Sequence, residues 1–170
     1  WSDRVVNGLF KLEGTPNQGR DMNHGGTGWE TLSFDFTGST STGVNGVTLI
    51  FDNGTMGAGG DDWTFYFDNM TLPATSTGGG DTGGSSGSGL SAIDFESGGA
   101  GASYAWAVFE NSDNPALEII ANPDMSGANT SATVAKFTAR LDGQVYAGVE
   151  SAHGDFGPLT LDGTNSTVKT

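Results

Sequence analysis

The sequence has no cysteine and very little positive charge. Six Lys and Arg residues stand against 20 Asp and Glu residues, which gives a formal net charge of −14 at pH 7. Without cysteine there is no disulfide framework, no cysteine-ligated metal site and no cysteine nucleophile. The acidic field excludes a nucleic-acid partner and disfavours anionic membrane surfaces. No segment approaches the roughly 18 consecutive apolar residues that span a bilayer, so we expect no membrane insertion.

Signatures of catalysis are also scarce. The chain has only two histidines, no H-E-x-x-H pattern occurs, and there is no G-x-S-x-G nucleophile elbow, since the one match to that pattern, GGSSG at 83–87, lies in a glycine- and serine-rich stretch. Glycoside hydrolysis needs two carboxyl groups about 5 to 9.5 Å apart across one sugar bond. The candidate pairs are Glu110 with Asp113 and Asp61 with Asp62, and neither pair lies in a catalytic strand motif. The sequence therefore predicts a protein that is not an enzyme.

Glycine is abundant, and one glycine-rich stretch divides the chain. Residues 76–89 read STGGGDTGGSSGSG, a composition typical of a flexible linker. Residues 1–75 lie before it and residues 90–170 after it, and each piece is small for an independent domain. The chain begins at Trp1, and we expect it to be a mature or trimmed piece of a longer protein.

Both pieces have the pattern of short β-strands. In WETLSFDF (29–36) Leu32, Phe34 and Phe36 alternate with polar residues, and no window has helical periodicity. Strands are predicted near 29–36, 46–51, 63–72, 92–96, 103–109, 116–121, 132–138, 145–150 and 158–162. Clusters of Gly, Asn, Asp and Pro separate them. We expect an all-β fold, an antiparallel β-sandwich of jelly-roll type built from two complementary halves.

Several motifs resemble a known family. The run DFESGGAGASYAWAVFENSDNPALEIIANPDMSGANTSATVAKFTAR, followed by YAGVES and LDGTNSTVK, resembles the opening half of bacterial extracellular carbohydrate-binding-type jelly-roll modules. The runs SDRVVNGLFKLEG, GWETLSFDFTG, TLIFDNG and DDWTFYFDNMTL resemble the closing half. Such modules are often appended to secreted polysaccharide-degrading enzymes. The resemblance implies an extracellular or cell-surface location, which the cysteine count alone leaves open.

The two halves stand in swapped order relative to that family. Residues 1–75 match the C-terminal half of a module and residues 90–170 the N-terminal half. The chain is then either a circularly permuted single module or a window from a tandem array whose halves pair with adjacent copies. We favour the array origin, because the missing connection falls within a predicted strand.

The resemblance also implies a structural calcium ion. Related modules often hold Ca²⁺ between the first and last strands, and the matching positions here are Asp68 and Glu96, with Asp94 nearby. Calcium takes six to eight hard oxygen ligands, which carboxylates and loop carbonyls supply. In the alternative interpretation, Asp68 caps its strand and Glu96 faces water. The acidic loop at 52–62 is a second candidate chelator.

A sugar-binding site needs an aromatic platform and polar side chains for the hydroxyl groups. The candidate residues are Trp106, Tyr104, Tyr146, Glu150, His153 and Asn111. Tyr104 and Trp106 lie two residues apart and so share a strand face. The competing interpretation makes Trp106 a core residue, and we expect Trp29 and Trp63 to be structural.

These observations predict a non-catalytic, extracellular carbohydrate-binding-type β-sandwich module that recognises polysaccharide by aromatic stacking. The alternative is a structural repeat of an extracellular fibre, filament or adhesin, in which open strand edges pair with neighbouring copies. The expected partners are therefore a polysaccharide or other copies of the same chain.

Overall fold

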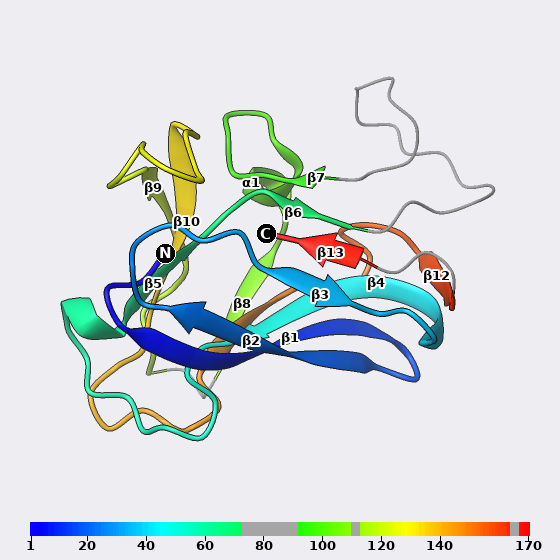
Figure 1. Ribbon diagram of the computed structural model, residues 1–170, viewed down its shortest axis with the longest axis horizontal. Coiled ribbons are helices and arrows are strands. Elements are labelled where there is room, and N and C mark those ends of the chain that lie inside the picture. The colour runs from blue at the N-terminus through cyan, green and yellow to red at the C-terminus, as the bar shows by residue number, and fades with distance from the viewer. Residues whose placement is uncertain (73–91, 110–112, 164–166) are drawn as a thin grey trace.

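The computed structural model describes residues 1–72, 92–109, 113–163 and 167–170, and within these ranges antiparallel strands form three sheets (Figure 1). The strands are β1 (Val5–Thr15), β2 (Gln18–Gly25), β3 (Ser33–Asp35), β4 (Thr40–Ile50), β5 (Thr64–Phe67), β6 (Met70–Thr71), β7 (Ala92–Ile93), β8 (Trp106–Phe109), β9 (Glu118–Ala121), β10 (Thr133–Thr138), β11 (Gly148–Ser151), β12 (Leu159–Asp162) and β13 (Thr167–Lys169). The predicted linker at 76–89 lies outside the described residues.

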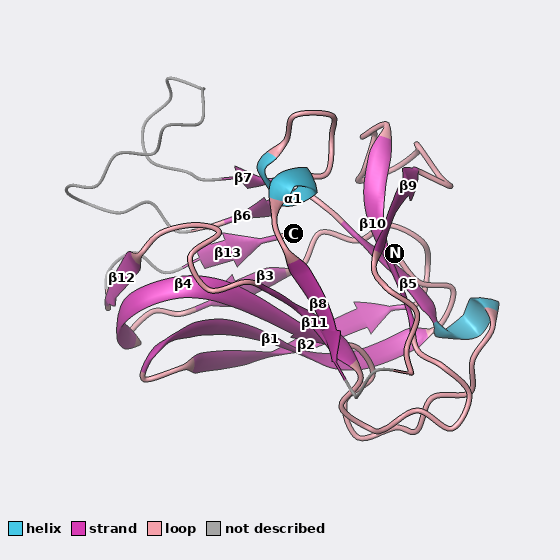
Figure 2. Cartoon of the chain, turned by 180° about the vertical axis from the view of Figure 1, so that it is seen from behind, coloured by secondary structure: helices cyan, strands magenta, loops and turns pink. Residues whose placement is uncertain are grey.

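Helical structure in the described residues is limited to single turns. A 3₁₀ turn, η1 (Asp61–Trp63), precedes β5, and a one-turn helix, α1 (Ala100–Ser103), precedes β8 (Figure 2). Across the described ranges no helix is long and apolar enough to cross a bilayer. The all-β antiparallel fold that the sequence predicts is confirmed.

The largest sheet has the strand order β2-β1-β4-β11-β8, and β12 also pairs with β4. Its inner face follows from alternation along the strands. Phe10 and Leu12 of β1 pair with Leu49 and Val47 of β4, and all four side chains are buried. Opposite this sheet stand β5-β10-β9 and β3-β13-β6-β7.

Each of the three sheets contains strands from before and from after the predicted linker. In the largest sheet β4 pairs with β11, and in the three-stranded sheet β5 pairs with β10. In the four-stranded sheet β13 lies between β3 and β6, and β6 also pairs with β7 (Figure 1). Residues 1–72 and 92–170 therefore complete each other's sheets within one chain.

The core between the layers is rich in phenylalanine. Phe51 stacks on Phe65 and on Phe137, with ring centroids 5.0 Å apart in each pair. Phe10 stacks on Phe34 at 4.5 Å. Full burial of one such side chain contributes about 1.5–3 kcal/mol. These rings come from both ends of the chain, so the core binds the two segments together.

Each strand range that the sequence predicts overlaps a strand of the structure. The long hairpin of β1 and β2 was not predicted. In β2 only Met22 and His24 face inward, and the other side chains are polar or are glycine, so this edge strand has little apolar alternation. Its pairing with β1 extends over eight residue pairs and is set by the neighbouring strand.

Candidate functional site

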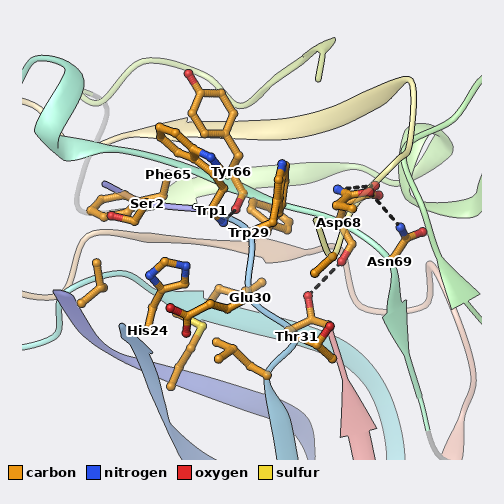
Figure 3. A pocket seen from close by; sticks show the side chains of 18 of the residues that line it. Trp1, Ser2, His24, Trp29, Glu30, Thr31, Phe65, Tyr66, Asp68 and Asn69 are labelled. Carbon is orange, nitrogen blue, oxygen red and sulfur yellow. Dashed lines mark hydrogen bonds between the residues drawn. The ribbon is translucent and has the colours of Figure 1, made fainter. Parts of the chain in front are cut away.

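A pocket of about 250 Å³ opens between the layers, beside the loop that joins β2 to β3 and the end of β5 (Figure 3). Three aromatic residues line it, and each is partly exposed: Trp1, Trp29 and Tyr66. The rings of Trp1 and Trp29 lie at its mouth, whereas the Tyr66 ring lies on the other face of β5 from Phe65 and Phe67 and packs on Trp1. We call this the aromatic pocket. Partly exposed aromatic rings beside a hollow are a common platform for ligands that have one apolar face.

Hydrogen bonds hold the aromatic rings in place. The main chain of Trp1 pairs with the edge of β5, because its nitrogen donates to the Tyr66 carbonyl at 2.6 Å and the Tyr66 N–H donates to the Trp1 carbonyl at 3.2 Å. The two rings meet edge to face at 5.3 Å. The Trp29 indole N–H donates to the Asp124 carbonyl at 2.7 Å and also contacts the Asn122 side-chain oxygen at 3.3 Å. The mouth is therefore pre-organised.

His24 at the pocket wall is held in its neutral form. The Gly26 N–H donates to Nδ1 at 2.9 Å, so the ring proton resides on Nε2 and points to the Gly28 carbonyl, 2.8 Å away. Burial is the largest cause of a lowered pKa of His24, against an opposing effect of Glu30. Gly26 has φ +80°, and a β-carbon there would lie 2.4 Å from the Arg4 carbonyl carbon, so this turn requires glycine.

Glu30 supplies a carboxylate at the mouth. The Gly25 N–H donates to both of its oxygens at 3.0 Å, and the Thr27 hydroxyl donates to Oε1 at 3.2 Å. These hydrogen bonds, chiefly the one from Gly25, lower the pKa of Glu30. The carboxylate is oriented and ionised at neutral pH, so it is an acceptor for a ligand hydroxyl group.

The floor of the pocket has a different chemistry. Six buried side chains without oxygen or nitrogen form it: Val6, Met22, Leu49, Phe51, Phe65 and Phe67. They belong to β1, β2, β4 and β5, and to the residue after β4, so they come from both layers. Four buried polar side chains also line the pocket, namely Ser2, His24, Asp68 and Asn129, so the hydrocarbon floor lies beside buried polar groups.

The three predicted calcium ligands lie along two neighbouring segments, and each accepts hydrogen bonds from the protein. Buried Asp68 accepts from the Phe95 N–H at 3.3 Å and from the Asn129 amide at 3.2 Å. Asp94 accepts from the Glu96 N–H at 3.1 Å.

Glu96 in turn accepts from the Ala132 N–H at 2.5 Å and the Thr133 N–H at 3.2 Å. Within the described ranges no three His, Asp or Glu side chains are grouped closely enough to hold a metal ion. These oxygens face N–H donors, an arrangement that does not fit a cation held by the three carboxylates together. Calcium binding stays a prediction.

The predicted platform residues Tyr104 and Trp106 lie together, with ring centroids 6.2 Å apart. Trp106 packs on Phe67 and Phe95, and its indole N–H donates to the Gly101 carbonyl at 2.8 Å. Most of the Trp106 side chain therefore packs against core residues. The remaining edges line a second hollow of about 350 Å³, which also contains Val108, Ala116, Leu117 and Ile119.

The predicted polar companions do not gather around that platform. Glu150 pairs with Ala107, whereas Trp106 pairs with Ser151, so Glu150 lies on the opposite face of the sheet. His153 is exposed beside Gly46. Tyr146 is 48% exposed on the loop before β11. Asn111 lies outside the described residues.

The residues of the aromatic pocket were not predicted as a site. Trp63 is buried in the core, as predicted, but Trp29 lines the pocket although a structural role was expected. A signal was available at Trp29: it follows the glycine-rich turn at 25–28 and precedes an acidic residue. Nothing in the sequence links it to Trp1 or Tyr66, which only the sheet arrangement brings near.

Comparison with known proteins identifies no relative of this chain. The chain matches no protein-family model, no curated protein and no solved structure. The resemblance to carbohydrate-binding-type modules therefore stays a prediction from motifs. What the chain shares with such modules in this structure is its all-β antiparallel architecture, which is compatible with a β-sandwich.

Proposed function

We propose that this protein is a non-catalytic, extracellular carbohydrate-binding β-sandwich module and that it recognises polysaccharide at the aromatic pocket. The observation that carries the proposal is the mouth itself, where Trp1 and Trp29 lie at one opening beside an oriented carboxylate. Aromatic faces stack on the apolar face of a sugar ring, and the Glu30 carboxylate accepts hydrogen bonds from its hydroxyl groups.

Charge favours a neutral polysaccharide as the ligand. The net charge of −14 repels anionic polymers at low ionic strength and leaves neutral glycans unaffected. Lys169 also lines the pocket, and it is one of only six basic residues in the chain. One ammonium group does not reverse the field of the whole molecule.

Native affinity electrophoresis through gels that contain soluble neutral polysaccharides tests the proposal. The protein is expected to be retarded by at least one of them. Trp1→Ala and Trp29→Ala are each expected to weaken binding about tenfold or more, which corresponds to about 1.4 kcal/mol. Tyr146→Ala is the matched control, because it removes an exposed aromatic side chain that does not line the pocket.

Two results would contradict this assignment. Absence of retardation on every glycan would remove the carbohydrate-binding function. Retardation that is lost in Tyr146→Ala and kept in both pocket variants would move the site to the loop before β11.

A second candidate function, a repeat assembled by strand complementation, has one observation in its favour. Among the described strands β8 pairs only with β11 and β9 only with β10, so both are sheet-edge strands. They border the second hollow, whose lining has no charged side chain, and Ile119 there is 42% exposed. Open edges beside an apolar groove recruit strands from other chains.

The oligomeric state in solution tests this second candidate. Assembly is expected to increase with protein concentration in sedimentation equilibrium, and Ile119→Lys is expected to reduce it, because a charge at an edge strand opposes pairing. Thr160→Lys, an exposed change on β12, adds the same charge elsewhere and is the control. A protein that stays monomeric at all concentrations argues against a structural repeat.

A further inference from the structure

The two parts of the aromatic pocket set different requirements on a ligand, and this inference rests on the proposed function. At the mouth, the Glu30 carboxylate can accept hydrogen bonds from ligand hydroxyl groups, and aromatic faces can stack on a sugar ring. Below the mouth, the six floor side chains offer no hydrogen-bond partner, and none of the six is more than 6% exposed. Sugar hydroxyl groups that contact these six side chains stay unsatisfied, which is unfavourable, whereas buried Ser2, His24, Asp68 and Asn129 supply the polar groups elsewhere in the lining.

The pocket is also small. Leu49 of the largest sheet and Phe65 and Phe67 of β5 line it, and all three are buried. A chain end or a side branch places one small group in such a hollow, whereas the interior of a polymer chain needs room for several sugar rings. A volume of about 250 Å³ is slightly below the roughly 300–1,000 Å³ of pockets for drug-sized ligands, so the pocket suits one small group.

We propose that the aromatic pocket binds a terminal sugar residue that carries an apolar substituent, such as a short acyl or an aryl group. The sugar ring lies at the mouth beside Trp1 and Trp29, and the substituent contacts the hydrocarbon floor. Burial of the substituent supplies affinity that scales with its apolar area. The sugar hydroxyl groups remain at the rim, where Glu30 and water satisfy them.

Paired glycosides test this inference. Methyl and phenyl β-glycosides of the sugar that builds the retarding polysaccharide are titrated into the protein, and tryptophan fluorescence reports binding. The phenyl glycoside is expected to bind at least tenfold more tightly than the methyl glycoside. Phenol alone is expected to bind at least tenfold more weakly than the phenyl glycoside, because it lacks the contacts at the mouth.

A floor variant supplies a second test. Val6→Phe adds volume to the floor, and it is expected to abolish the preference for the phenyl glycoside over the methyl glycoside. Overpacking can destabilise a core, so its fold is checked by circular dichroism. If Val6→Phe does not fold, the titrations on the unaltered protein decide alone.

The outcomes separate this inference from the proposed function. Equal affinity for methyl and phenyl glycosides, or binding of the polysaccharide without binding of either glycoside, overturns the inference and leaves carbohydrate binding intact. Equal affinity for phenol and the phenyl glycoside also overturns it, because the sugar then contributes nothing. If neither polysaccharide nor glycoside binds, the proposed function fails and this inference fails with it.

Discussion

At the residue scale, His24 in the pocket wall makes the stability of the protein depend on pH. Its Nδ1 accepts a hydrogen bond from the Gly26 N–H, so protonation of that nitrogen breaks the bond and places a proton against a donor. The charged form is also disfavoured by burial, which lowers the pKa of the folded state below the ordinary value of about 6.5.

We therefore expect stability to fall as the pH drops below about 6.5. On acidification the unfolded chain takes up a proton at His24 before the folded chain does, so the stabilising contribution of neutral His24 is present above this pH and is lost below it. Thermal melts between pH 5.5 and 8 measure the slope. His24→Gln is expected to flatten it, because glutamine does not titrate.

His153→Gln is the control for that measurement. It removes the only other histidine, which is exposed, and it is expected to keep the wild-type slope. A His24→Gln variant whose melting temperature changes with pH as steeply as that of the wild type would contradict the role of His24.

At the element scale, Asp68 joins three segments. It follows β5, and its carboxylate accepts from the main chain of Phe95 after β7 and from the side chain of Asn129 before β10. Its own carbonyl accepts from the Thr170 hydroxyl at 2.9 Å. A short strand such as β6 or β7 has few ladder bonds of its own, so side-chain bonds of this kind fix its position.

Asp68→Ala is expected to lower the free energy of unfolding by about 1–3 kcal/mol, because it leaves the buried partners of the carboxylate unsatisfied. Urea denaturation measures the change. Asp35→Ala is the comparison: Asp35 is exposed and accepts from the Thr37 N–H within its own loop, so a smaller loss is expected there. A loss at Asp68 no larger than at Asp35 would refute the structural role.

The predicted calcium site lies at the same strand ends. If the resemblance to calcium-holding modules extends to the metal, added Ca²⁺ raises the melting temperature and a chelator lowers it. Asp68→Ala is expected to remove that difference. Equal midpoints with calcium and with chelator reject the metal site and leave Asp68, Asp94 and Glu96 as acceptors for protein N–H groups.

Comparison of sequence and structure at this scale shows what alternation can predict. The strands with clear apolar alternation or apolar runs, such as β4, β5 and β10, lie where the sequence places them. β2 was not predicted, because an edge strand with a polar outer face lacks apolar alternation. The side of the sheet that Glu150 occupies depends on its pairing with Ala107, and a single sequence contains no record of strand register. The aromatic pocket was not predicted either, because its residues are brought together only by the pairing of the strands.

At the scale of the whole molecule, the two segments are held together by pairing in every sheet. β4 with β11, β5 with β10 and β13 with β3 all join residues before the predicted linker to residues after it. Each segment alone exposes strand edges and half of a phenylalanine-rich core, so neither is expected to fold by itself.

A protease site introduced within 76–89 tests this interdependence. After cleavage the two fragments are expected to co-elute in size-exclusion chromatography, because the sheets rather than the linker hold them. Denaturation followed by separation is expected to leave each fragment unfolded, and mixing is expected to restore the circular dichroism of the intact protein. Fragments that separate without denaturant would contradict the shared core.

The pairing of early with late strands also has a consequence for biosynthesis. A ribosome delivers β4 and β5 well before their partners β11 and β10, so the nascent chain carries exposed hydrogen-bonding edges until those partners have been made. Contacts between residues so distant in sequence form slowly and leave intermediates prone to aggregate. Holdase chaperones that shield those edges during synthesis are expected to raise the yield of soluble protein.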